Sequence, residues 1–117
     1  LTPEQVEAVT AFAYAEMLEA GFTRVGEFHY LHHAADGAPY AEPAEMCARI
    51  AAASAEAGIR LTLLPVLYNR SGFGGAPTRP AQRRFVNTPD TYARLVEGAE
   101  AALRALDGGI VGAAAHS

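Results

Sequence analysis

Two segments of this sequence end in side chains that can do chemistry. The first, residues 26–33, is an apolar and aromatic run that contains Tyr30 and closes with two histidines. The second, residues 109–115, is built of small and branched residues and leads directly to His116. Phenols and imidazoles exchange protons and bind ligands, and α/β folds gather such groups at the carboxyl ends of parallel strands. We therefore expect a ligand site where these two segments end.

The histidines of the first segment do not by themselves predict a metal site. Imidazole is a common zinc ligand, but a closed zinc site needs four ligands, and His29 and Tyr30 point to opposite sides of a strand. Tyr30 is expected either as a hydrogen-bonding phenol at the rim of a pocket or as a buried aromatic residue. His32 and His33 are expected to be solvated loop residues.

His116 is the best placed of the candidate residues, as a proton donor, proton acceptor or ligand at a strand end. The alternative is a terminal histidine that has no partner. Glu27, inside a strand, is expected to be either a buried carboxylate that needs a partner or an outward-facing charge, and a structural role is favoured. The single Cys47, in a helical pattern, is interpreted as a buried and inert thiol, which favours a reducing compartment.

The segment 68–87 is too long for an ordinary connection between a strand and a helix. Its length predicts a functional loop folded over the strand ends. Its glycines at 72–75 are not followed by Lys and Ser or Thr, so a nucleotide-binding loop is rejected. Its arginines either bind a carboxylate-bearing ligand or form a solvated face. These arginines are Arg70, Arg79, Arg83 and Arg84.

The elements that position these residues follow a repeated pattern of helix and strand. Cap residues, prolines and helical periodicity predict helices over residues 3–20, 43–57 and 88–106, and apolar runs predict strands over 23–30, 60–67 and 109–115. Pro65 predicts an irregularity near the end of the second strand. The expected inward residues are Val6, Val9, Ala13, Met17 and Ala20 in the first helix, Met46, Cys47, Ile50 and Ala53 in the second, and Tyr92, Leu95, Val96, Ala99, Leu103 and Leu106 in the third.

This order, α-β-α-β-α-β with three near-continuous apolar strands, predicts an α/β fold with a parallel sheet. The pattern begins with a helix and ends with a strand, whereas a complete α/β domain has a strand before its first helix and a helix over its last strand, so residues 1–117 are expected to be one piece of a larger α/β domain. A net charge of −4 gives no electrostatic footprint for nucleic acid or an anionic membrane. No apolar run approaches the length of a membrane span, and a cytoplasmic location is expected.

Four separated stretches of this sequence resemble one family. They are residues 26–33 (GEFHYLHH), 61–68 (LTLLPVLY), 71–75 (SGFGG) and 82–85 (QRRF). In this order they resemble formimidoylglutamate deiminases, which belong to the amidohydrolase superfamily. The resemblance implies a (β/α)8 TIM barrel, of which this chain would supply strands two to four and helices one to three.

The resemblance further implies a metal-dependent hydrolase that converts N-formimino-L-glutamate to N-formyl-L-glutamate and ammonia in histidine degradation. Zinc would be the cofactor of the full-length parent, and its ligands and the catalytic proton shuttle would lie outside this chain. Tyr30 would contact the glutamate portion of the substrate, and His116 would form a hydrogen bond near its formimino group. The chain alone is expected to be inactive, and a homodimeric parent is left open.

Two alternatives remain at this point. One is a segment of another amidohydrolase-superfamily deaminase, which would act on a different amidine or ring. The other is a non-catalytic α/β binding module that uses the 68–87 loop. A module of that kind would have fully covered layers, whereas a segment of a barrel exposes the inner face of its sheet.

Overall fold

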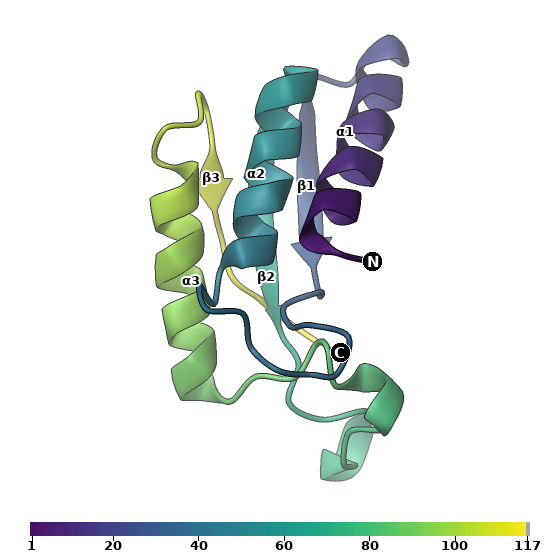
Figure 1. Ribbon diagram of the computed structural model, residues 1–117, viewed down its shortest axis with the longest axis vertical. Helices are drawn as coiled ribbons and strands as arrows, with labels where there is room; N and C mark the ends of the chain where they lie inside the picture. Colours follow the sequence, from purple (N-terminus) through teal and green to yellow (C-terminus); the bar gives the residue numbers. More distant parts are fainter. Residues whose placement is uncertain (117) are drawn as a thin grey trace.

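The computed structural model describes residues 1–116, and Ser117 lies outside the described residues. Within that range three α-helices alternate with the strands of a parallel sheet (Figure 1), in which β2 pairs with β1, β3 and β4. The elements are α1 (Pro3–Glu19), β1 (Arg24–His29), α2 (Glu45–Ala57), β2 (Arg60–Leu67), α3 (Pro89–Leu103), β3 (Ile110–Val111) and β4 (Ala114–Ala115). The predicted order and parallel pairing are confirmed, and β2 has the bounds that its sequence predicts.

The helix boundaries follow from local chemistry. Thr2 and Thr88 each accept a hydrogen bond from a backbone N–H of the first turn, and a proline follows each of them at the first helical position. Gly58 ends α2 in the left-handed region, with φ of 89°. These caps fix where α1 and α3 begin and where α2 gives way to β2.

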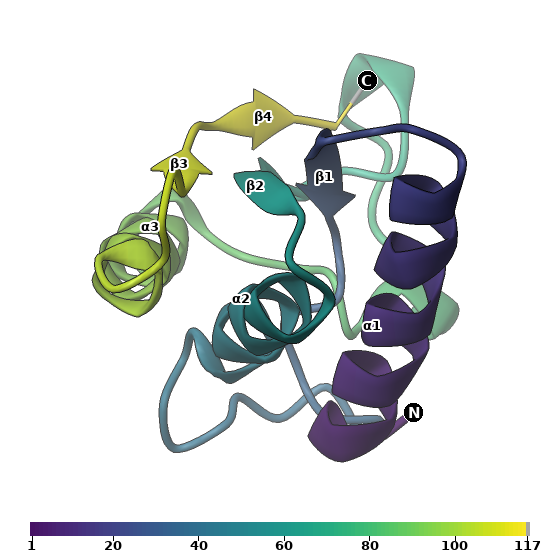
Figure 2. The same ribbon diagram turned by 90° about the horizontal axis from the view of Figure 1, so that it is seen from above.

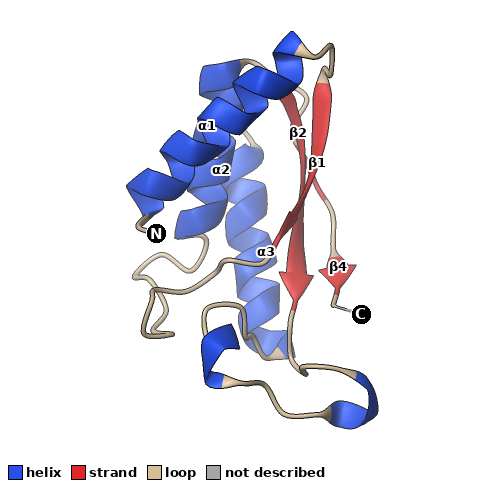
Figure 3. Cartoon of the chain, turned by 90° about the vertical axis from the view of Figure 1, so that its right-hand side faces the viewer, coloured by secondary structure: helices blue, strands red, loops and turns tan. Residues whose placement is uncertain are grey.

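The helices cover only one face of the sheet, as the views in Figures 2 and 3 show. Val25 and His29 of β1 are buried, whereas Phe28, which points to the other side, is 63% exposed. Ile110 of β3 is 52% exposed. We call this uncovered side the open face. An exposed apolar sheet face is what the predicted barrel segment requires, and it does not fit a module with fully covered layers.

The core lies between the sheet and the helices. Leu61 and Leu63 of β2 are fully buried at its centre. The residues that α2 was predicted to turn inward, Met46, Cys47, Ile50 and Ala53, are all buried, as are Leu95, Ala99 and Leu103 of α3. Burial of this apolar area is the main force that holds the three helices on the sheet.

The buried face of α1 matches the prediction only in part: Val6 is buried and Met17 packs against the core, as predicted, but the other three residues are exposed. Val9 is 59% exposed, and Ala13 and Ala20 are also exposed. Tyr14 is buried instead, because its hydroxyl donates a 2.7 Å hydrogen bond to the Glu27 carboxylate on the helix-covered side of β1. This polar partner rotates α1 away from the face that apolar periodicity selects.

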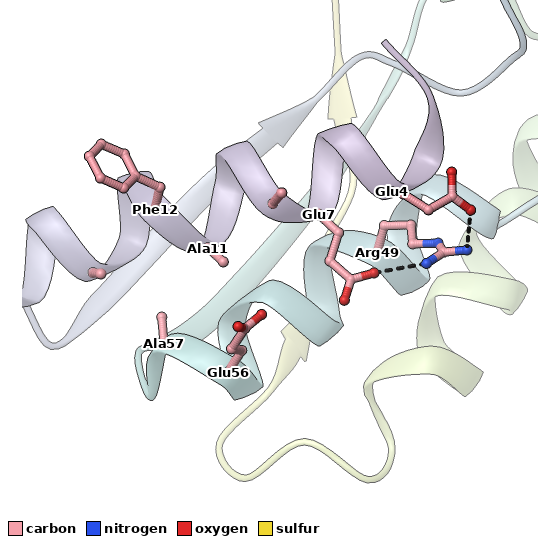
Figure 4. Close-up of a pocket in the computed structure, with 9 residues that line it drawn as sticks. Glu4, Glu7, Ala11, Phe12, Arg49, Glu56 and Ala57 are labelled. Atoms are coloured by element: carbon pink, nitrogen blue, oxygen red, sulfur yellow. Dashed lines mark hydrogen bonds and ion pairs between the residues drawn. The ribbon is translucent and has the colours of Figure 1, made fainter.

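Arg49 of α2 joins this helix to α1 through two carboxylates of α1 (Figure 4) and also pairs with one carboxylate of its own helix. Its guanidinium lies 3.1 Å from Glu4, 2.9 Å from Glu7 and 2.9 Å from Glu45, and the last of these is the predicted pair one helical turn away. The hydrogen bonds that Arg49 donates to Glu7 and Glu45 raise the pKa of its guanidinium above its usual value. The groove of about 590 Å³ beside this cluster is a seam between two helices whose arginine is already fully paired.

The predicted strand 109–115 is divided into β3 and β4, and Pro65 of β2 explains the division. In a parallel ladder alternate residues bond to the same neighbour, and the Leu63 and Leu67 carbonyls accept from the N–H groups of Gly112 and His116. Pro65, midway between them, has no N–H to donate. Its carbonyl accepts a 2.7 Å hydrogen bond from the Tyr92 hydroxyl of α3 instead. The predicted irregularity therefore falls on the partner strand.

Gly98 allows α3 to approach the start of α2. A Cβ atom at this position would lie 2.5 Å from the Cβ of the buried Ala44. We expect Gly98→Ala to lower the free energy of unfolding by about 1–3 kcal/mol, although alanine is the better helix former, because the added methyl group overpacks a rigid contact. Chemical denaturation measures this change. Glu97→Ala, an exposed neighbour on the same helix, is the control, and equal or greater stability in Gly98→Ala would contradict the packing argument.

Candidate functional site

The ends of β1, β2 and β4 bring three ring side chains together. Tyr30 follows β1, Tyr68 follows β2 and His116 follows β4, and the strands are in register as His29 opposite Pro65 and Leu67 opposite Ala115. Each of the three comes directly after the last residue of its strand. Parallel pairing therefore places them at one edge of the sheet, as predicted for Tyr30 and His116.

The rings of these residues pack against one another and against Phe85, and we call the four residues the aromatic cluster. The imidazole of His116 stacks on Tyr68, with centroids 4.2 Å apart and planes inclined by 27°. Tyr30 meets the other three rings edge to face, at centroid distances of 6.0 Å to His116 and 6.1 Å to Tyr68 and to Phe85. The Nδ1 atom of His116 is buried and has no hydrogen-bond partner among the described residues. This atom can donate to or accept from a ligand that enters the cluster.

Phe85 belongs to the long loop, which turns back over the strand ends as predicted. Two short 3-10 turns, Phe73–Gly75 and Pro80–Gln82, give this loop its shape. The Arg84 carbonyl accepts from the N–H groups of His32 and His33, at 2.9 and 3.0 Å. These bonds hold Phe85 on the rings of Tyr30 and Tyr68.

The arginines of this loop divide into two groups. Arg83 donates to the Ala35 carbonyl at 2.7 Å, and Arg84 donates to the His33 carbonyl at 3.0 Å and to the Leu1 carbonyl at 2.9 Å. These two guanidinium groups therefore fasten the loop. Arg70 is exposed and lines, with His116 and Phe73, a shallow depression of about 420 Å³ beside the aromatic cluster.

The remaining histidines of the first segment do not join the cluster. His29 points to the helix-covered side, opposite to Tyr30, as predicted. His32 was expected to be solvated, and this was wrong: it is 1% exposed, and its Nε2 donates to the Val66 carbonyl at 3.0 Å. His33 is half-buried and bonds the Val86 carbonyl at 2.7 Å. His32 thus holds the loop after β1 to β2, and His33 holds it to the long loop at Val86, roles that loop position alone does not reveal.

Residues 1–116 contain no group of three or more His, Cys, Asp or Glu side chains placed to hold a metal ion. The described residues therefore do not form a metal centre by themselves. Cys47 is fully buried, and burial raises the pKa of its thiol to about 12, which suits an inert core residue. Glu27 has the structural partner that was expected, and burial followed by this hydrogen bond raises the pKa of Tyr14.

Besides Phe85, Tyr68 is the cluster residue that was not predicted from the sequence as a candidate site residue. It is 5% exposed, and its carbonyl accepts from the Asn87 N–H at 3.1 Å. A signal was present in the sequence, because Tyr68 follows its strand at the same position as Tyr30 follows the first strand.

Among the described residues no helix is both long enough and apolar enough to cross a bilayer.

Buried histidines make the stability of this region depend on pH. Burial, with a smaller contribution from His32, lowers the pKa of His29 from 6.5 to about 3, and burial lowers the pKa of His32 to about 4. Below pH 6.5 these two histidines bind protons in the unfolded chain but remain neutral in the folded chain. Their contribution to the free energy of unfolding is therefore fully present above this pH and is lost as the pH falls.

We expect the free energy of unfolding to fall as the pH is lowered from 6.5 towards 4, by up to about 1.4 kcal/mol per pH unit for each histidine. His29→Leu should reduce this slope, as measured by denaturation at a series of pH values. Val25→Ala, on the same face of β1, is the control, because it shifts the whole curve and leaves the slope unchanged. A slope in His29→Leu equal to that of the wild type would contradict the assignment.

Comparisons with known proteins agree with the predicted resemblance. No protein-family model matches the chain. A formimidoylglutamate deiminase of Pseudomonas aeruginosa is 52% identical over 105 residues, which are 90% of this chain and 23% of that protein. The crystal structure of an amidohydrolase from Brucella melitensis superposes with a TM-score of 0.97 at 59% identity, over 99% of this chain and 26% of that chain.

The chain thus spans about a quarter of the length of the relatives it matches. The predicted likeness to formimidoylglutamate deiminase is confirmed, and so is the α/β fold with parallel strands. A partial (β/α)8 barrel is consistent with this match and with the open face of the sheet.

Proposed function

We propose that this chain is the substrate-contacting part of a formimidoylglutamate deiminase, corresponding to strands two to four and helices one to three of its barrel. The proposed reaction is the hydrolysis of N-formimino-L-glutamate to N-formyl-L-glutamate and ammonia. Water adds to the formimino carbon, the C–N bond to the terminal nitrogen breaks, and that nitrogen leaves as ammonia. In this proposal the enzyme acts in histidine degradation in the cytoplasm.

One observation supports the assignment of the proposed function to particular residues. Tyr30 and His116, to which the resemblance assigns substrate contact, come from segments 86 positions apart and lie in one aromatic cluster with centroids 6.0 Å apart. The phenol of Tyr30 would bind the glutamate portion. The buried, unpartnered Nδ1 of His116 would donate to or accept from the formimino nitrogen.

Zinc, which the resemblance implies, forms part of the proposal only for the remainder of the enzyme. Because the described residues provide no metal centre, no step is assigned to a metal within this chain. What these residues contribute is binding and orientation of a small, doubly carboxylated substrate. The chain by itself is therefore expected to show no deiminase activity.

A chimaera tests this proposal. The matching segment of the Pseudomonas deiminase is replaced by this chain, with the junction placed after His116, and ammonia release from N-formimino-L-glutamate is measured with added zinc. We expect activity close to that of the parent enzyme, because the two segments are 52% identical. A folded chimaera that is inactive on this substrate but active on another amidine or ring would instead favour a different deaminase of the superfamily.

Within an active chimaera, Tyr30→Phe should lower kcat/KM about tenfold, because one hydrogen bond to the substrate is lost while the ring packing remains. His116→Phe should lower it by on the order of a hundredfold, because the stack on Tyr68 remains while both ring nitrogens are lost. Tyr40→Phe, which removes a phenol outside the cluster, is the control. Unchanged kcat/KM in both cluster variants would refute their assignment to substrate contact.

A further inference from the structure

A second cavity lies away from the aromatic cluster, between the loop that follows β1 and the start of α3. We call it the loop cavity. Its volume is about 440 Å³, within the usual range for small-molecule sites, and its walls come from residues 32–43 and 86–95. The two walls are held together by the 2.7 Å bond from His33 to the Val86 carbonyl. The cavity is therefore a built feature of the fold and not a gap between mobile segments.

The loop cavity is lined by a positively charged side chain and by no negatively charged one. Arg94 lines it, and no Asp or Glu side chain does. Asp90 and Glu97 flank Arg94 on α3, but no ion pair to Arg94 forms among residues 1–116. An arginine without an acidic partner at the mouth of a cavity is suited to a carboxylate, which it binds with two parallel hydrogen bonds.

The polar groups deeper in the loop cavity are also suited to an anion. Asn87 lines it and is 4% exposed, yet its side-chain nitrogen has no hydrogen-bond partner within the described part of the chain. A buried amide N–H without a partner is costly, and a ligand acceptor would satisfy it. Asn87 also immediately precedes the capping residue of α3, whose amino end carries positive partial charge.

The remaining lining is mostly apolar and points to an organic ligand. Tyr40, Val86, Leu95 and two prolines form much of the wall. Such a surface gains little from an inorganic ion and gains from a ring or a short hydrocarbon body. Arginine at the mouth, a buried amide donor and apolar walls together describe a small molecule with one carboxylate and one apolar end.

We propose that the loop cavity is a binding site for a small organic carboxylate, separate from the aromatic cluster. This site does not depend on the proposed deiminase function, since none of its residues is assigned a part in that reaction. A ligand there would fasten the two walls and, through the bond from His32 to the Val66 carbonyl, the end of β2. The site is thus placed to report the presence of a metabolite to the edge that carries Tyr68.

Titration with benzoate, followed by backbone amide NMR and by calorimetry, tests this site on the purified chain. We expect saturable binding with shift changes at residues 32–43 and 86–95 and, through the bond from His32 to the Val66 carbonyl, at the end of β2. Benzamide has the same shape without the charge and should bind at least about tenfold more weakly. Inorganic phosphate should not displace benzoate.

Arg94→Gln should weaken benzoate binding about tenfold. Arg104→Gln is the control, because Arg104 is exposed at the other end of α3, and this variant should bind benzoate like the wild type. Calorimetry on the chimaera described above repeats the measurement in a complete barrel. Absence of saturable binding in both proteins, equal binding of benzoate and benzamide, displacement by phosphate, or an unchanged Arg94→Gln would each overturn the proposal.

Discussion

The carbonyl groups at the end of β2 and at Tyr68 accept hydrogen bonds from four separate parts of the molecule. These parts are the loop after β1, the long loop, α3 and the β3–β4 segment. The donors are Gly112 N–H to Leu63, Tyr92 hydroxyl to Pro65, His32 Nε2 to Val66, His116 N–H to Leu67 and Asn87 N–H to Tyr68. Each bond fixes one neighbouring element against the same short stretch of backbone. The aromatic cluster and the loop cavity are both positioned by this stretch, so the geometry of both depends on β2.

The sheet is built to be buried on both faces, but the helices of this chain cover only one. On the open face β2 carries Leu64 and Val66 after Arg60 and Thr62, and Phe28 and Ile110 of the neighbouring strands present more apolar area there. Parallel sheets with such strands normally have both faces covered. The match to about a quarter of two longer relatives is in keeping with this pattern, since the interior of a barrel is filled by residues from all its strands.

The sequence was sufficient for features that depend on local chemistry and periodicity. The bounds of β2, the inward face of α2 and the caps of α1 and α3 follow from patterns within a few residues. Features that depend on a distant partner were not predictable. The face of α1 is set by the bond from Tyr14 to Glu27, and the burial of His32 by the Val66 carbonyl. Pro65 signalled an irregularity, but only the ladder shows that the break lies between Val111 and Ala114. The placement of Tyr30 and His116 at one edge was predictable because each follows its strand directly.

The stack of His116 on Tyr68 has a magnetic consequence. An imidazole held 4.2 Å from the centre of a phenol ring, with the planes inclined by 27°, lies in the shielding region of that ring's circulating π electrons. The carbon-bound protons of His116 therefore resonate upfield of their random-coil positions. These proton shifts therefore report the geometry at the strand ends in a one-dimensional NMR spectrum, without isotope labelling.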